Sequence, residues 1–431
     1  MSLRSALDAA RRRGHEARQR YRPLWQQPLV RVARVWRGAL RRTLVVGITG
    51  SCGKTTAKDL TAAVLGSRLR GTRTRDTCNS PYNVARTLFR TFPWHDFAVV
   101  EVGAWAPDTL GRAAPVLRPR VAVVTNVGSD HRKGFRSLEA TAAEKGRLVA
   151  AVPADGVAVL NGDDPLVLAM RARCAGRVLT FGLAPGADLR ATDVRAVWPD
   201  RLSFTLHRDG AALRVRTRLC GEHWVGCALA AIAVGIAAGI PPAEAAAALA
   251  AVEPAAGRMS PVELEDGVVF VRDDWKAPLW SIPPALEFLR TARATRRVAV
   301  IGTLSDYPGS NEKRYAAVAR QALEAADHVV FVGRWSRGAL RAAPAGRPDA
   351  LLAFERLEGA AEHLREFLRP GDLVLLKGSL TVDHLERIIE ARRAGGARGP
   401  AAAPSAAVGR SATFVREAAA AQGPGGGMRP T

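Results

Sequence analysis

A glycine-rich segment near the start of the chain carries the residue types that bind phosphate groups. Its residues, Gly47–Thr56, read G-I-T-G-S-C-G-K-T-T and follow an apolar run that fits a buried strand. Closely spaced glycines let backbone N–H groups turn toward an anion, and a helix that begins after them adds the positive end of its dipole. We expect Lys54 to reach the β- and γ-phosphates of a nucleotide and the Thr55 hydroxyl to bind Mg²⁺.

The segment departs from the strict phosphate-loop pattern G-x-x-x-x-G-K-[ST]. Ile48 stands where the first glycine belongs, and Gly47 lies one position early. A glycine-rich turn with a solvated lysine is the alternative interpretation. The order of apolar run, glycine-rich turn and helical sequence favours a nucleotide site.

Other polar residues follow apolar runs farther along the chain. Glu101 ends the run A-V-V, and the sequence T-N-V-G-S-D-H, which closes with His131, follows V-A-V-V. The carboxyl ends of parallel strands meet at one edge of a sheet, and a carboxylate there suits Mg²⁺. Taken alone, Glu101 is also compatible with an ordinary carboxylate paired with an arginine, His131 with a surface histidine, and Lys145 with a solvated helix lysine.

Short apolar runs alternate with helical segments from residue 43 onward, which predicts a mostly parallel α/β sheet. The expected strands are Leu44–Ile48, Phe97–Val102, Val121–Thr125, Val157–Leu160, Val178–Phe181, Leu202–Leu206 and Leu213–Thr217, then Val298–Ile301, His328–Val332 and Asp372–Leu376. The expected helices include 225–238, 312–326 and 357–368. We divide the chain into a basic segment (1–42), a central domain (43–292), a second α/β domain (293–390) and an Ala/Gly/Pro-rich tail (391–431) that we expect to be disordered.

Charge is concentrated at the ends of the chain. The 431 residues carry a net charge of +23, and residues 1–42 are rich in arginine with only Asp8 and Glu16 as acids. After Pro28, Leu29, Val32, Trp36 and Leu40 recur at helical spacing. This segment is compatible with a solvated basic helix or with peripheral contact with anionic lipid. Nucleic acid is disfavoured because no recognition motif accompanies the charge.

Cysteine usage indicates a reducing compartment, and hydropathy indicates that the most apolar stretch is a core helix. The five cysteines are odd in number and form no C-x-x-C pair, which argues for free thiols and against a zinc site or a disulfide framework. We find no signal-peptide pattern. The most apolar stretch, Val225–Ile240, is short and is followed by two prolines, so it predicts a core helix. We expect a cytoplasmic protein, peripheral to the inner membrane face if the basic segment binds lipid.

Taken in order, these motifs resemble the Mur ligases, the ATP-dependent ligases that build the peptidoglycan stem peptide, and within them the D-alanyl-D-alanine-adding branch. The resemblance covers Thr43 to Ile389. The matching landmarks are Gly47–Thr56, Glu101–Gly103, Thr125–Gly128 with His131, Glu144-Lys145, Leu160–Asp164, Gly221-x-His223, Gly257–Met259, Asp273-Asp274 and Lys377–Ser379. It implies a P-loop-containing, mostly parallel central sheet domain followed by a smaller Rossmann-like α/β domain.

The resemblance also implies a role for each matching residue. The residues implied to bind ATP are Gly50, Ser51, Gly53, Lys54, Thr55, Thr56, Asn83, Arg258, Asp273 and Asp274, with Asn79 as an alternative to Asn83 near the γ-phosphate. The implied Mg²⁺ ligands are Thr55, Glu101, His131 and Lys145, the last as a carbamate, which unlike an ammonium is an oxygen ligand. The implied catalytic residues are Lys54, His131 and Lys145.

The implied reaction is amide-bond formation through an acyl phosphate. Its implied substrates are a carboxylate-bearing small molecule or lipid-linked precursor and the amine of an amino acid or dipeptide, in cell-wall peptide or related polymer synthesis. Two alternatives remain open: a nucleotide-binding scaffold or regulator without ligase activity, and a different P-loop kinase or NTPase.

Several positions depart from the family pattern. The basic residues 1–42 stand where the family has its N-terminal uridine-nucleotide-binding domain, and we expect that domain to be missing. Trp224 and Cys227 stand where the family has asparagines, and Lys276 also replaces an asparagine. We therefore expect ATP-dependent ligation with altered substrates. Lys54 and the helix N-terminus also suggest a lowered pKa and a reactive thiolate at Cys52, with an inert small side chain as the alternative.

Overall fold

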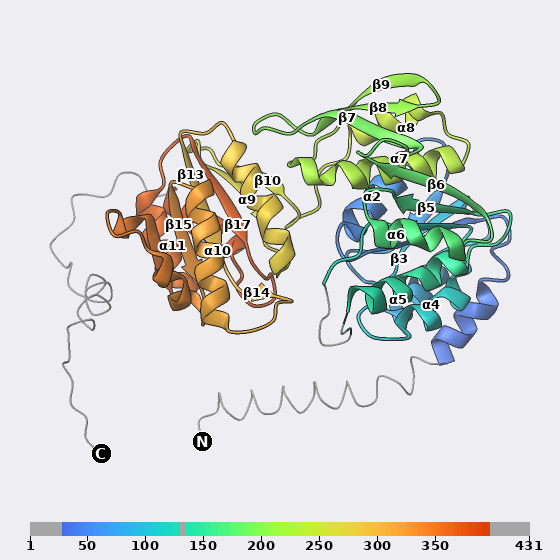
Figure 1. The fold of residues 1–431 in the computed structure, drawn as a ribbon, viewed down its shortest axis with the longest axis horizontal. Coiled ribbons are helices and arrows are strands. Elements are labelled where there is room, and N and C mark those ends of the chain that lie inside the picture. The colour runs from blue at the N-terminus through green and yellow to red at the C-terminus, as the bar shows by residue number, and fades with distance from the viewer. Residues whose placement is uncertain (1–27, 130–134, 136, 397–431) are drawn as a thin grey trace, which may run out of the picture.

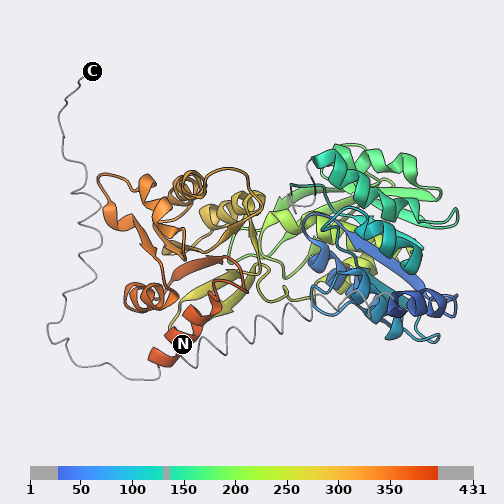
Figure 2. The ribbon, with the colours of Figure 1, turned by 90° about the horizontal axis from the view of Figure 1, so that it is seen from below.

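The computed structural model describes residues 28–129, 135 and 137–396, which form two α/β lobes (Figure 1, Figure 2). The first lobe contains a nine-stranded sheet and the second a six-stranded sheet. The predicted site residue His131 lies outside the described residues. The expected fold class, a mostly parallel central sheet followed by a smaller α/β unit, is confirmed.

The first sheet has the strand order β2-β3-β1-β4-β5-β6-β7-β8-β9. Pairing is parallel from β2 to β7, and β8 and β9 extend the sheet as antiparallel strands. The bounds are β1 Leu44–Thr49, β2 Gly71–Arg73, β3 Phe97–Glu101, β4 Val121–Val124, β5 Val157–Asn161, β6 Arg177–Gly182, β7 Leu189–Arg195, β8 Ser203–Arg208 and β9 Ala211–Arg216. The central strands are apolar throughout because helices cover both of their faces.

Helices on the two faces form separate cores. The bounds are α2 Lys54–Gly66, α3 Pro81–Phe89, α4 Thr109–Leu117, α5 Leu138–Ala150, α6 Pro165–Leu168, α7 Val225–Ala237 and α8 Pro242–Leu249, with 3₁₀ turns η1 Ala169–Arg173 and η2 Glu222–Trp224. Val46 and Ile48 of β1 pack on one face with α2 and α7, whereas Val45 packs on the other with α3 and α4. Helix α7 is apolar on all sides and is buried, as the sequence predicts.

The second sheet has the strand order β10-β11-β17-β13-β15-β16. Its bounds are β10 Ser260–Glu263, β11 Val269–Asp273, β13 Arg296–Ile301, β15 His328–Val332, β16 Leu351–Phe354 and β17 Asp372–Lys377. The remaining elements are β12 Ala277–Pro278, η3 Leu279–Ser281, α9 Ile282–Thr291, β14 Leu304–Ser305, α10 Asn311–Ala325, η4 Ser336–Ala342, η5 Pro348–Ala350, α11 Leu357–Phe367 and α12 Glu386–Gly396. Helix α12 continues past residue 391, where the sequence predicts the tail to begin.

The division between the lobes differs from the predicted boundary at residue 292. Strand β11 pairs with β17 along its whole length, and β10 pairs with β11, so residues from 260 onward belong to the second sheet. The first lobe ends after α8, before residue 260. The partner strand β17 lies about one hundred residues farther along the chain, so the local pattern could not reveal this pairing.

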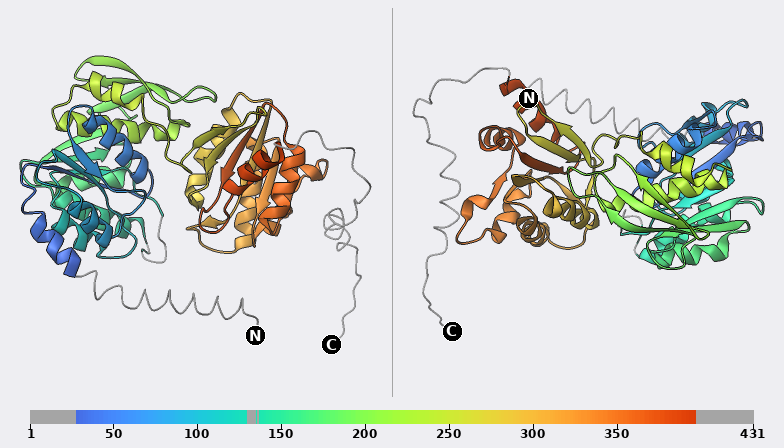
Figure 3. Two further views of the ribbon diagram at one scale, coloured as in Figure 1. Left: turned by 180° about the vertical axis from the view of Figure 1, so that it is seen from behind. Right: turned by 90° about the horizontal axis from the view of Figure 1, so that it is seen from above.

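A helix at residues 28–36 packs against the first lobe, away from the second (Figure 3). Ala33 and Leu40 are fully buried there, and the Trp36 indole donates hydrogen bonds to the Leu88 and Thr91 carbonyls, both at 3.0 Å. The predicted apolar stripe is therefore wrong at Val32, which is 55% exposed. Among the described helices, none has the length and apolar character needed to cross a membrane.

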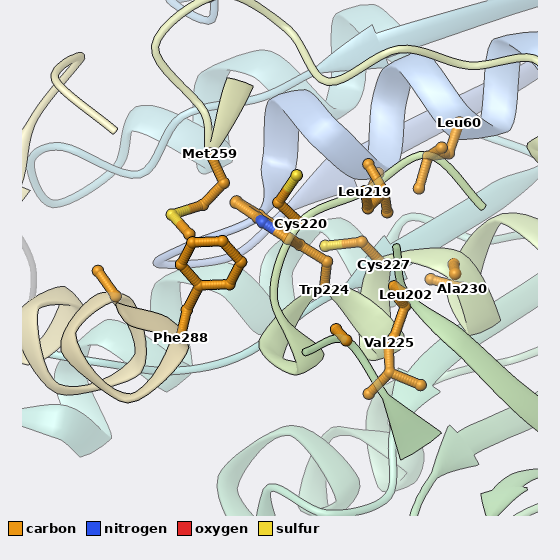
Figure 4. Packing of buried hydrophobic residues seen from close by; sticks show 14 of the residues in the cluster. Leu60, Leu202, Leu219, Cys220, Trp224, Val225, Cys227, Ala230, Met259 and Phe288 are labelled. Carbon is orange, nitrogen blue, oxygen red and sulfur yellow. The ribbon is translucent and has the colours of Figure 1, made fainter. Parts of the chain in front are cut away.

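Apolar contacts join the two lobes. Figure 4 shows Met259 and Phe288 of the second lobe beside Trp224 and Cys220 of the first. Phe288 also meets Trp198 edge-on, with ring centroids 6.5 Å apart. One continuous buried cluster therefore extends across both lobes and holds the carboxyl ends of their sheets near each other.

Candidate functional site

The glycine-rich loop lies between β1 and α2, in the strand–turn–helix context that the sequence predicts. Gly50 and Gly53 have φ angles of 150° and 76°. A Cβ at Gly50 would lie 1.9 Å from Thr125 Oγ1, and one at Gly53 would lie 2.6 Å from Cys227 Sγ. Both positions therefore require glycine for conformational and steric reasons.

Residues that follow β4 hold the loop in place. The Ser51 N–H donates to the Asn126 carbonyl at 3.0 Å, and the Cys52 N–H donates to Asn126 Oδ1 at 2.8 Å. The Thr125 hydroxyl donates to the Cys52 carbonyl, and the Gly128 N–H donates to Ser51 Oγ at 2.7 Å. The strand ends that the sequence places at one rim do meet there, and these bonds fix the loop before any ligand binds.

Hard oxygen atoms lie next to the loop. The Thr55 hydroxyl donates to Glu101 Oε2 at 3.0 Å, and Asn79 Nδ2 donates to Glu101 Oε1 at 2.9 Å. Glu101 is 1% exposed. Within the described residues no group of three or more His, Cys, Asp or Glu forms a protein-only metal site. A hydroxyl and a single carboxylate beside a phosphate cradle fit Mg²⁺, which keeps phosphate and water oxygens as its other ligands.

The two candidate asparagines have different surroundings. Asn79 reaches Glu101, whereas the Asn83 side chain donates to Ser80 Oγ at 3.0 Å at the N-terminus of α3. Lys54 is half-buried, and its ammonium donates to the Gly50 carbonyl at 2.7 Å, across the loop. Asn79 is thus the asparagine that contacts the residues around Thr55.

Lys145 is completely buried in α5. Leu148 of the same helix lies against Gly47, where an added Cβ would be 3.1 Å from its Cδ1 atom. Lys145 precedes Leu148 by three residues, so it shares that face and lies nearly one turn closer to the carboxyl edge of the sheet. Its neighbour Glu144 accepts hydrogen bonds from the Asp108 and Leu110 N–H groups at the start of α4.

The second lobe contributes its own polar group at strand ends. Asp273 ends β11 and Lys377 ends β17, the two residues are paired in register, and Lys377 Nζ lies 2.6 Å from Asp273 Oδ2. Asp274 is fully buried beside Arg272, and burial raises its pKa despite that arginine. Arg258 lies over the Trp275 ring, 5.5 Å from its centroid.

Arg258 Nε is buried and has no hydrogen-bond partner among the residues that the structure describes. A buried guanidinium nitrogen without an acceptor is costly, so an anionic ligand at this position would stabilise it. The sequence-predicted residues Arg258, Asp273 and Asp274 thus lie on the lobe whose strand ends face the loop.

The charges of both lobes act on Cys52. Burial raises the pKa of the Cys52 thiol, and the positive charges of Arg258, Lys54 and Lys377 offset that increase only in part. The predicted lowered pKa and reactive thiolate are therefore wrong, because loss of solvent outweighs the nearby cations. Burial also lowers the pKa of His223 to about 4, so this imidazole is neutral at pH 7.

Comparison with known proteins identifies the arrangement. The Mur ligase middle domain model matches residues 48–235, and the model described as Mur ligase, glutamate ligase domain, matches residues 257–380. A UDP-N-acetylmuramoyl-tripeptide–D-alanyl-D-alanine ligase of Mycobacterium bovis is 33% identical over 362 residues, covering 78% of this chain and 70% of the relative. The chain belongs to the Mur ligase family.

Other relatives agree. The ligase of the same description from Escherichia coli is 30% identical and covers 70% of this chain and 67% of its own length. MurF from Acinetobacter baumannii has a TM-score of 0.77 at 25% identity, covering 85% of this chain and 80% of its own. MurF from Thermotoga maritima, solved with ADP, shares the fold at 23% identity with a TM-score of 0.75, covering 86% and 83%. The resemblance that the sequence predicts is confirmed, and the chain is an ATP-dependent, amide-forming ligase of Mur type.

Against the Mur pattern, the substituted positions lie at the junction of loop and second lobe. Cys227 packs under Gly53, and its thiol donates to the Gly53 carbonyl at 3.5 Å. Lys276 pairs with Asp306 at 2.7 Å. Trp280, to which the sequence pattern gives no role, lies beside Gly128, and its Nε1 atom is buried without a hydrogen-bond partner in the described structure. These departures alter the surroundings of the phosphate loop without removing Lys54, Thr55 or Glu101.

Proposed function

We propose that this chain joins an amino acid or dipeptide amine to a carboxylate in cell-wall peptide or related polymer synthesis, with ATP and Mg²⁺. The observation that carries the proposal is the phosphate loop with Thr55 and Glu101 at 3.0 Å, facing the Asp273–Lys377 pair of the second lobe. Relatives that share both domains are named as ligases that use a muramoyl-tripeptide nucleotide and D-alanyl-D-alanine.

We assign the nucleotide to the loop and to the second lobe. In this assignment the loop at Gly50 and Gly53, together with Lys54 and Thr56, binds the phosphates, and Ser51, whose N–H donates to the Asn126 carbonyl, positions the loop. A phosphate oxygen would then accept a hydrogen bond from the buried Arg258 guanidinium. Asp274 or Asp273 binds the ribose, and Asn79 or Asn83 lies near the γ-phosphate. Thr55 and Glu101 hold Mg²⁺, together with Lys145 as a carbamate and with His131, which lies outside the described residues.

The two chemical steps follow from this placement. A carboxylate oxygen of the acceptor attacks the γ-phosphorus, the bond to the bridging oxygen breaks, and ADP leaves. The amine nitrogen then attacks the acyl carbon, the bond from that carbon to the phosphate oxygen breaks, and phosphate leaves as the amine loses a proton. Bound Mg²⁺ neutralises phosphate charge. Lys54 and the loop N–H groups hold the transferred group in line, and the second lobe excludes water from the acyl phosphate.

The proposal is tested by phosphate release with ATP–Mg²⁺, the muramoyl-tripeptide nucleotide and D-alanyl-D-alanine, with products identified by mass spectrometry. A mass gain equal to the dipeptide less one water confirms both reaction and substrates. ATP binding without that product means that the acceptor is a different carboxylate, and lipid-linked carboxylates are then tested first. Phosphate release or a phosphorylated product without a new amide identifies a kinase or NTPase. If the Lys145→Ala variant keeps the full ligase activity of the wild type, the role assigned to Lys145 is contradicted.

We also propose that the basic segment 1–42 contacts an anionic membrane surface on its cytoplasmic side. Its arginine content supports this, as does the exposure of Val32 and Val35 beside Arg31 and Arg34 on the docked helix. Because Trp36 and Leu40 belong to the core, deletion of the whole segment would disturb the fold. Replacement of Arg11, Arg12 and Arg13 by Gln is the better test, and unchanged sedimentation with anionic vesicles would contradict the proposal.

A further inference from the structure

Four arginines line a cavity at the amino edge of the first sheet. The cavity has a volume of about 370 Å³ and is lined by Arg37, Gly38, Arg41, Thr43, Arg118, Arg120 and Pro153. Thr43 precedes β1, Arg120 precedes β4 and Pro153 precedes β5, so the cavity opens where these parallel strands begin. The phosphate loop lies at the other end of β1, roughly 20 Å away for a strand of six residues.

Backbone carbonyls, rather than carboxylates, hold two of these guanidinium groups in place. Arg37 donates to the carbonyls of Leu117, Leu40 and Arg118, at 2.8, 2.9 and 2.9 Å. Arg118 has a left-handed backbone with φ of 43° and donates in turn to the Arg34 carbonyl at 3.0 Å. These bonds fix the positions of the two charges but do not neutralise them.

The cavity has an excess of positive charge. Asp155 pairs with Arg120 at 2.8 Å, and the pair is more than half exposed. Arg41 is exposed and makes no side-chain hydrogen bond or ion pair with the described residues. Burial and the adjacent Arg118 charge lower the pKa of Arg37 to about 10, so Arg37 remains charged at pH 7 beside a like charge. Three of the four arginines therefore lack an acidic partner among the described residues.

We propose that this cavity is a binding site for a phosphate group, separate from the nucleotide site. Guanidinium groups present forked N–H donors that match phosphate oxygens, and held in place they bind with little further loss of conformational freedom. A phosphate placed among Arg37, Arg41 and Arg118 would relieve their mutual repulsion. The same chemistry is offered by a lipid headgroup and by a soluble phosphate compound. This site goes beyond the ligase function. The lipid headgroup or the soluble phosphate compound would bind beside the segment that precedes β1.

The test compares Arg41→Glu with Arg216→Glu, an equal charge change at an exposed arginine on β9, far along the same sheet. Arg41 makes no side-chain bond among the described residues, so its replacement should leave the fold intact; Arg118→Gln is the second variant. In the soluble arm, pyrophosphate is titrated with ADP at saturation, and the thermal unfolding midpoint is followed. In the lipid arm, sedimentation with phosphatidylcholine vesicles is compared with and without phosphatidylglycerol.

We expect the Arg41→Glu and Arg118→Gln variants to lose about tenfold in affinity in one arm, which is about 1.4 kcal/mol, because each removes a charged hydrogen-bond donor from the site, while Arg216→Glu follows the wild type. The arm in which this occurs identifies the source of the phosphate. Equal behaviour of all the variants and the wild type in both arms would overturn the site. ADP binding by the wild type is measured separately, so a failure of the ligase proposal is distinguishable from a failure of this one.

Discussion

Gly53 illustrates how a single position combines conformational and packing constraints at the phosphate loop. Its φ of 76° is unfavourable for other residues, and a Cβ added there would lie 2.6 Å from Cys227 Sγ. Gly239 has a similar φ of 83° but open space around it. The two glycines therefore separate the cost of backbone strain from the cost of a steric clash.

We predict that Gly53→Ala destabilises the protein more than Gly239→Ala and abolishes ADP binding. The left-handed backbone costs about 1–2 kcal/mol at either position, and overpacking against Cys227 adds about 1–3 kcal/mol at Gly53. Urea unfolding and ADP titration measure both effects. Adding Cys227→Ala should recover the steric part of the loss. Equal free energies of unfolding for the two glycine variants would show that the loop tolerates a methyl group.

The buried His328 makes the stability of the protein depend on pH. Burial, chiefly, and also the nearby His363 lower the pKa of His328 to about 4, with Arg296 acting in the same direction and Asp349 opposing them. Its ring stacks on Phe367. Because the folded pKa lies below the unfolded value, the unfolded state binds more protons between the two. Stability is therefore complete above pH 6.5 and falls as the pH drops toward 4.

We predict that His328→Gln, which removes this titration, reduces the acid-side loss of stability. The difference between wild type and variant should reach on the order of 2 kcal/mol between pH 7.5 and 4.5, since each pKa unit corresponds to about 1.4 kcal/mol. Urea unfolding at the two pH values measures it. An acid-side loss that is the same in both proteins would assign acid sensitivity to other groups.

At the same scale, the residue types of the site were readable from the sequence, and their surroundings were not. Lys54, Thr55 and Glu101 were found from motif and strand-end position, and their approach follows from parallel β1 and β3. The pKa of Cys52 depends on how completely the second lobe and β4 cover it, which no local pattern contains. Asn79, and not Asn83, contacts Glu101. This depends on the conformation of the backbone just before α3, which the local sequence does not specify.

At the scale of elements, predictions held where periodicity was local. The parallel strands around β1 were predicted within a residue or two, because apolar runs between polar turns define them. Strand β10 was not predicted because its sequence S-P-V-E contains only one large apolar residue. Strand β11 was not predicted although V-V-F-V at 268–271 is an apolar run; its partner β17 lies far along the chain. Strands β2, β7 and β16 were also not predicted. Strand β2 is short and polar, and in β7 apolar residues are interspersed with charged and polar ones.

The helix at 28–36 shows a second limit of periodicity. The helical conformation ends at residue 36. Leu40 therefore reaches the core from the segment that follows the turn at 37–39, and not from the face of the helix. Ala33 occupies the core-facing position that the helical spacing predicts for Val32. A small apolar residue on an arginine-rich helix gives a weak signal, and the orientation is decided by the long-range bonds of Trp36.

We predict that Trp36→Phe detaches this helix more than its lost volume suggests. The change leaves the Leu88 and Thr91 carbonyls without their indole donor, which costs about 1–2 kcal/mol. Thermal unfolding and hydrogen exchange at residues 28–40 measure the effect. Val35→Ala, at a residue 79% exposed on the same helix, should change stability by less than about 0.5 kcal/mol. Similar exchange rates in both variants would contradict the docking role of Trp36.

At the scale of the whole molecule, the candidate site exists only because two sheets present their carboxyl ends to each other. The loop, Thr55 and Glu101 come from the first lobe, and Asp273 and Lys377 come from the second. The sequence predicted two such units from their strand patterns. It could not predict the apolar contacts that join them, because Phe288 belongs to none of the motifs and lies far along the chain from Trp198. Met259 does end the motif Gly257–Met259, but only the tertiary fold places it beside Trp224.

Phe288 lies at the junction between the lobes, and we predict that Phe288→Ala uncouples their unfolding. The ring packs on Trp198 and beside Met259, and its removal should cost about 3–5 kcal/mol. Because much of that loss falls on contacts between the lobes, we expect calorimetry to resolve two unfolding transitions where the wild type shows one. Arg293→Ala is the control: its ion pair with Asp200 also crosses the junction, yet both side chains are more than 60% exposed, so the change should leave a single transition. A single transition in both variants would mean that polar contacts around Asp273 and Lys377, rather than the apolar junction, couple the lobes.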